Sequence, residues 1–144
     1  MALTVPTVAV GDDVLASWAN SAKAAIDDLY TTVSDTTIAT AGSGWVINSG
    51  MIARTALGGK LVMIHVYCQR TAALTVASGN ITDETMCTLD AAYRPSDALN
   101  MIIGTGSETG EATISAAGVV SLRSLSDSAA AAANYRGTVT FLTA

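Results

Sequence analysis

The strongest pattern in the chain is an alternation of side chains over residues 60–70, which predicts a long β-strand. Successive side chains of a strand point to opposite faces of its sheet. One set of positions holds Val62, Ile64, Val66 and Cys68. The other set, also largely apolar, holds Leu61, Met63, His65 and Tyr67. We expect the first set to face a core and the second to be covered by a loop or a neighbouring subunit, so the second set gives candidate interface residues.

Shorter β-forming runs lie on both sides of this strand. They cover residues 45–47, 51–53, 73–77, 81–89, 98–104, 111–115, 119–125 and 135–143. Turn residues such as Asn48-Ser49-Gly50 and Gly58-Gly59 separate them. Roughly seven to nine short strands at this spacing predict a mainly β protein, an antiparallel β-sandwich of jelly-roll-like type over residues 45–144.

The pattern of acidic and apolar positions over residues 12–34 predicts a helix. Asp12 and Asp13 follow Gly11 and supply a cap and negative charge at its amino end. Apolar positions recur at spacings of three and four, as one helix face requires. They form a heptad-like seam of Leu15, Trp18, Ala22, Ala25 and Leu29. Because so short a seam makes a weak coiled coil, two alternatives stay open: the helix associates with copies of itself, or it packs on the β body or on a host surface.

The first ten residues predict an extended arm, because Val and Thr dominate and Pro6 excludes a helix interior. Leu3, Val5 and Val8 could add to the sheet edge of a neighbour, or the segment could be a frayed terminus. A Ser-, Thr-, Ala- and Gly-rich stretch after the helix predicts a linker. We therefore expect an arm and helix at 1–35, a linker at 36–44 and the β domain at 45–144.

Composition adds an argument for self-assembly. The chain has 144 residues, half of them apolar and only 13% charged, and its mean hydropathy is +0.43. Soluble domains carry about 25% charged residues, so part of the surface is expected to be buried between copies. A neutral surface of Thr, Ser and Ala is the alternative.

Charge and apolar runs exclude several partners. The net charge is −5 and the seven Lys and Arg residues are scattered singly, which argues against nucleic acid. No apolar run approaches the ~20 residues of a membrane span, and the amino terminus lacks the pattern of a signal peptide, so we expect synthesis in a cytoplasm. Cys68 and Cys87 are expected to be buried free thiols, with a bridge between them the alternative.

The sequence offers no constellation for catalysis, and we expect no enzyme activity, cofactor or metal site. His65 is the single histidine and lies in the strongest strand, where a core or interface role is the more frequent one. The glycine-rich run 104–110 lacks the lysine and following helix of a nucleotide loop, and a hairpin tip explains it better. Asp83-Glu84 has no clustered aromatic platform of the kind that glycosidases use.

Two stretches of the body resemble a β-sandwich module of bacteriophage virion proteins. They are GNITDETMCTLDAAYRP at 79–95 and ISAAGVVSLRSL at 114–125, and Tyr93-Arg94-Pro95 is the most specific part. Residues 10–30 are similar to amino-terminal helices of small phage structural proteins. The resemblance implies a trimeric virion component, such as a capsid decoration protein, a head fibre or a receptor-binding tip.

Two functions follow as hypotheses. The first is a homotrimeric capsid decoration protein on the capsid surface, bound to the phage major capsid protein through its arm and helix. The alternative is a tail or fibre-tip module that recognises a ligand on the host surface. The alternative predicts a pocket lined by Trp45, Tyr67 or Tyr93.

Overall fold

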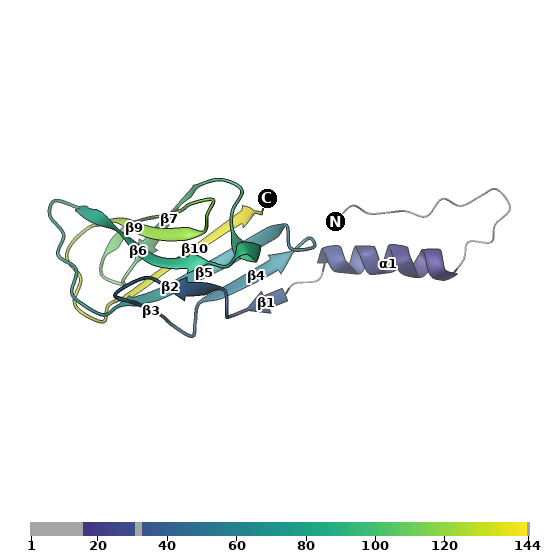
Figure 1. Ribbon diagram of the computed structural model, residues 1–144, viewed down its shortest axis with the longest axis horizontal. Helices are drawn as coiled ribbons and strands as arrows, with labels where there is room; N and C mark the ends of the chain where they lie inside the picture. Colours follow the sequence, from purple (N-terminus) through teal and green to yellow (C-terminus); the bar gives the residue numbers. More distant parts are fainter. Residues whose placement is uncertain (1–15, 31–32, 144) are drawn as a thin grey trace.

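The computed structural model describes residues 16–30 and 33–143, with helical side chains from Asn20 to Asp27. Within these residues, one helix precedes ten strands and one 3₁₀ turn. Figure 1 shows how the helix and the strands are arranged. The elements are α1 (Ala16–Tyr30), β1 (Val33–Asp35), β2 (Ala39–Ala41), β3 (Trp45–Ile47), β4 (Ile52–Ala56), β5 (Leu61–Arg70), β6 (Asn80–Leu89), η1 (Ala91–Tyr93), β7 (Leu99–Gly104), β8 (Thr109–Ile114), β9 (Val119–Leu125) and β10 (Asn134–Leu142).

All the strands belong to one curled antiparallel sheet. Its order is β1-β4-β5-β10-β7-β8-β9-β6-β2, and β3 pairs with β5 beside β4. The prediction of a mainly β, antiparallel body is confirmed. The jelly-roll-like sandwich is not confirmed, because the two layers around the core are halves of the same hydrogen-bonded sheet. Alternation in the sequence predicts that one face of a strand is buried, but it does not predict what covers that face. A second sheet can cover it, and so can the other half of the same sheet when that sheet curls over.

Strands β10 and β7 lie unusually close together beside Gly137. Only Arg136 and Gly104 are in register between these two strands. A Cβ added at Gly137 would lie 2.3 Å from Met101 Cε and 2.6 Å from the backbone oxygen of Ile102. The two strands therefore approach more closely than a larger residue at position 137 allows.

A short segment bridges the two open edges of the curled sheet. Residues 33–35 pair with β4 at one edge, and residues 39–41 pair with β6 at the other. Ile38 lies between them, is 1% exposed, and its carbonyl accepts a hydrogen bond of 2.9 Å from the Asp90 backbone N–H. The segment that we predicted as a linker at 36–44 thus contains β2, although the wider division into an attachment region and a β domain stays a prediction.

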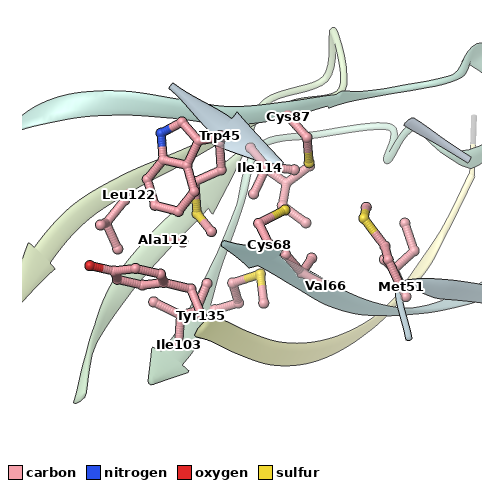
Figure 2. Close-up of a cluster of buried hydrophobic side chains, with 14 of the residues drawn as sticks. Trp45, Met51, Val66, Cys68, Cys87, Ile103, Ala112, Ile114, Leu122 and Tyr135 are labelled. Atoms are coloured by element: carbon pink, nitrogen blue, oxygen red, sulfur yellow. The ribbon is translucent and has the colours of Figure 1, made fainter. Parts of the chain in front are cut away.

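The core lies between the two halves of the sheet. The inward side chains of β5 are fully buried, as the alternation predicted. Trp45 of β3 and Tyr135 of β10 pack edge to face with ring centroids 5.0 Å apart, and Figure 2 shows both among the buried side chains. Cys68 and Cys87 are buried in the same core as free thiols, as expected. A core of this kind provides most of the stabilisation of a domain.

The helix lies outside the β body, at the end where β1 and β4 meet (Figure 1). Ala22 and Ala25 are partly buried, whereas Ile26 is 53% exposed. Lys23 and Asp27 form an exposed i,i+4 ion pair, which stabilises a helix by only a few tenths of a kcal/mol. A helix this short is marginal by itself, so its apolar side needs a further partner. Within residues 16–30 and 33–143, no helix is long and apolar enough to cross a membrane.

Candidate interaction surfaces

The four outward side chains of β5 form the centre of an apolar surface. Leu61, Met63, His65 and Tyr67 are each half-buried, in strict alternation with the fully buried positions. We call this surface the outer β5 face: the outward side chains of β4, β5 and β10. The structure therefore brings together four of the interface residues that the sequence predicted.

The neighbouring strands extend this face with both apolar and cationic side chains. On β4, the positions in register are Ile52, Arg54 and Ala56. On β10, they are Arg136, Thr138, Thr140 and Leu142. Leu142, opposite Leu61, is 60% exposed. The apolar side chains gather at the Leu61 end of this face, where Ala56, Leu61 and Leu142 are in register, and exposed apolar groups of this kind favour burial in an assembly.

The aromatic residue of this face is not free to stack on a ligand. The Arg136 guanidinium carbon lies 4.6 Å from the centre of the Tyr67 ring, and one of its N–H groups donates to Tyr67 Oη at 2.9 Å. A Cβ added at Gly50 would lie 2.6 Å from Tyr67 Cδ1, so the Gly50 backbone packs against the ring. His65 Nδ1 is 3.0 Å from Thr138 Oγ1, a hydroxyl and not a carboxylate. These contacts give Tyr67 and His65 structural roles in the face.

The opposite outer surface, on β6, β7, β8 and β9, is polar. Its register includes Asn100 opposite Thr113, and Thr113 opposite Ser121. Arg123 and Asp83 form a surface ion pair at 2.9 Å. Ile102 interrupts this surface and is 76% exposed. The contrast between the two outer surfaces singles out the outer β5 face as the one suited to burial.

Two long loops form a third surface, at the end of the sheet farthest from α1. We call it the distal end: the loops 71–79 and 126–133 with the β7–β8 hairpin. Leu74 and Ala129 pair through two backbone hydrogen bonds of 2.9 Å, which join the two loops. Ser78 and Ala132 have φ values of +56° and +61°, a conformation that is costly for residues other than glycine. Leu57, in the β4–β5 turn at the α1 end, has a similar φ of +54°, so this strain does not single out one end. The distal end is a candidate contact surface because loops joined over a rigid sheet often carry binding residues.

A partly buried ion pair holds the first of these loops in place. Arg70 donates to Glu84 through Nε at 2.7 Å and through Nη2 at 2.8 Å, a bidentate arrangement. The Glu84 carboxylate raises the pKa of the Arg70 guanidinium. Arg70 Nη1 also donates to the carbonyls of Ala72 and Ala73, at the start of the loop. Sequence reasoning missed this pair, because the two residues lie on different strands, β5 and β6.

The Tyr93-Arg94-Pro95 turn has a structural role at the α1 end of the body. Tyr93 Oη donates to Asp35 Oδ2 at 2.6 Å, which lowers the pKa of Asp35 and, with burial, raises the pKa of Tyr93 to about 12. Arg94 Nε donates to the Leu89 carbonyl at 3.0 Å, and Pro95 is buried. The turn thus connects the end of β6 to β1.

The remaining sequence-predicted residues are placed as follows. Leu3, Val5, Val8 and Leu15 lie outside the described residues, and the side chains of Trp18 and Leu29 lie outside the described part of α1. Ala22 and Ala25 share one side of the helix.

The pocket lined by Trp45, Tyr67 or Tyr93 is not formed, because Trp45 is buried in the core, Tyr67 is covered and Tyr93 is bound to Asp35. Across the described ranges, no group of three or more His, Cys, Asp or Glu side chains is arranged to hold a metal ion.

Comparison with known proteins bears on the fold. No protein-family profile matches the sequence, and no curated protein matches it. Among solved structures, the chain is similar to the receptor binding protein (gp15) of Listeria phage PSA, with a TM-score of 0.54 and 16% sequence identity. The similarity covers 94% of this chain and 82% of that one. The chain therefore has a fold that is also found in a phage receptor binding protein.

Proposed function

We propose that this protein is a non-enzymatic component of a phage virion that recognises a ligand on the host surface. The observation that carries the proposal is the fold similarity over 94% of the chain to a phage receptor binding protein. It agrees with the resemblance of residues 79–95 to phage virion modules. Of the two hypotheses from the sequence, these findings favour the receptor-binding one, and none supports the capsid surface or the major capsid protein as the partner.

The two ends of the molecule differ in a way that suits this role. Strand β5 begins at Leu61, beside the end of β4. Strand β1, which follows α1 in the chain, pairs with β4, so this is the α1 end of the body. Strand β5 ends at Arg70, at the opposite end. The loop after Arg70 lies at the distal end. A helix at one end and joined loops at the other allow attachment to the virion through α1 and contact with the host through the distal end (Figure 1). Binding residues in many proteins lie on loops positioned by a rigid sheet.

We further propose that the protein assembles as a homotrimer through the outer β5 face. Leu61, Met63 and Leu142 supply apolar area that the single chain leaves partly exposed. Arg54 and Arg136 lie on the same face. Three copies present three distal ends together, so individually weak contacts with a repetitive surface add up to strong binding.

The binding test uses the full chain labelled with a fluorophore and a panel of bacterial cell envelopes that includes Listeria walls. Binding to at least one envelope is expected. Thr75→Arg, in the loop 71–79, should abolish binding, whereas the matched control Thr85→Arg, on an exposed position of β6, should keep it. Equal binding by both variants would reject the distal end as the contact surface. Failure to bind any envelope, together with binding to empty phage capsids, would reject receptor recognition.

The assembly test measures the mass of the full chain in solution by light scattering after size exclusion. We expect three copies per particle. Met63→Asp places a charge in the outer β5 face and should give monomers, whereas Thr85→Asp should not change the mass. A monomeric unmodified chain would contradict the homotrimer.

A further inference from the structure

The two cysteines of the chain come from strands that face each other across the core. Cys68 lies near the end of β5 and Cys87 near the end of β6, and both side chains are fully buried. These strands belong to opposite halves of the curled sheet, separated along its order by β10, β7, β8 and β9. The sheet's curl alone makes the two positions neighbours.

The side chains of the two cysteines point toward each other. Figure 2 shows the two sulfur atoms directed into the same part of the core, between Ile114 and Val66. The thiols interact as hydrogen-bonding partners, which lowers the pKa of Cys68 and raises the pKa of Cys87. The described residues include no group of three or more His, Cys, Asp or Glu able to share a metal ion, so a zinc site does not explain the pair.

We propose that Cys68 and Cys87 form an oxidisable pair whose disulfide joins β5 to β6 across the core. A disulfide needs two Cβ atoms close together with their sulfur atoms directed at each other. Facing positions on two packed strands can supply this arrangement with small backbone adjustments. The bond would tie together the two halves of the sheet at the side where backbone pairing is interrupted and only the segment 33–41 bridges the edges.

The oxidation balances with a small-molecule disulfide such as oxidised glutathione. The Cys68 thiolate attacks one sulfur of that disulfide, forms a mixed disulfide and expels one glutathione thiolate. Cys87 then loses its proton and attacks Cys68 Sγ, which expels the second glutathione thiolate. Two protein thiols are oxidised, one glutathione disulfide is reduced, and the two protons go to the two released thiolates. The same balance holds if Cys87 attacks first, because the thiolate is the nucleophile in either order.

Access to the buried pair requires a local opening, and the fold offers one. Cys87 is paired with Ala41 of β2, a strand of three residues at the edge of the sheet. Short edge strands open with low free energy compared with global unfolding. If the protein acts outside the host, as the proposed function holds, the pair would be reduced during synthesis and oxidised after release. The bond itself does not depend on that function.

The test uses the full chain, first reduced and then incubated with oxidised glutathione. Mass spectrometry under denaturing conditions should show the loss of two hydrogen atoms, and both thiols should become unreactive to iodoacetamide. Closing a loop of this length should raise the melting temperature on the order of 10 °C, and a reductant should reverse the rise. Cys87→Ala should keep its melting temperature unchanged by the oxidant, at whatever baseline that variant has.

Three outcomes would overturn the proposal. They are two free thiols in the folded chain under conditions that oxidise the urea-unfolded chain, a disulfide only between chains on a non-reducing gel, and an internal disulfide that lowers the melting temperature. Each readout concerns the isolated protein, so failure here is distinct from failure to bind an envelope or to form trimers.

Discussion

Replacing Ile38 by alanine tests whether the segment 33–41 closes the curled sheet. The side chain is 1% exposed and lies between the residues that pair with β4 and those that pair with β6. The change removes three carbon atoms, worth about 2.4 kcal/mol at about 0.8 kcal/mol each, and leaves a cavity with a further cost. We expect the free energy of unfolding to fall by about 3 kcal/mol.

Urea denaturation of the full chain, followed by tryptophan fluorescence, measures this change, because Trp45 is buried in the core. The matched control is Val46→Ala on the neighbouring strand β3, where the side chain is 44% exposed. The control should change stability by at most about 0.5 kcal/mol. Hydrogen exchange should also accelerate at the Asp90 amide, which donates to the Ile38 carbonyl.

The reasoning would be refuted by a loss below about 1 kcal/mol for Ile38→Ala, because a well-packed isoleucine cannot be removed so cheaply. Unchanged exchange at the Asp90 amide would separately show that the bridging segment does not hold the edge of β6.

Two further predictions concern the α1 end and the close approach of β10 to β7. The hydrogen bond from Tyr93 lowers the pKa of Asp35 below its ordinary 3.8, so its stabilisation is present above about pH 4 and is lost as pH falls through the lowered value. Asp35→Asn should therefore flatten the acid limb of stability below pH 4 in urea titrations, and an unchanged limb would contradict this. Gly137→Ala places a Cβ 2.6 Å from the Ile102 oxygen and should cost about 1–3 kcal/mol by thermal unfolding, whereas Thr82→Ala, at an exposed position of β6, should cost little. Equal losses would show that the contact between β10 and β7 tolerates a side chain at position 137.

The candidate surfaces were only partly visible in the sequence. The outer β5 face could be predicted, because period-two alternation states which side chains share a face and both sets were apolar. The distal end could not be predicted as a surface, since the 71–79 and 126–133 loops are joined by Leu74 and Ala129, 55 residues apart in sequence (129 − 74). The Arg70–Glu84 pair was likewise hidden, because its geometry depends on how β5 and β6 face each other.

The same distinction holds for the fold. Local sequence determined that a helix lies within the predicted range 12–34, that 61–70 form a strand with one fully buried face, and that both cysteines are buried. The predicted carboxyl end of the helix was wrong, because residues 33–35 pair with β4 as strand β1. These features depend on side chains close together in the chain, where spacing and polarity act directly.

Only the tertiary structure decided that one sheet curls around its own core, that the segment 33–41 bridges its edges, and that Cys68 meets Cys87. Pairings such as β10 with β5 join residues far apart in sequence. Their stability depends on the packing of the whole core, and the alternation along each strand does not specify it.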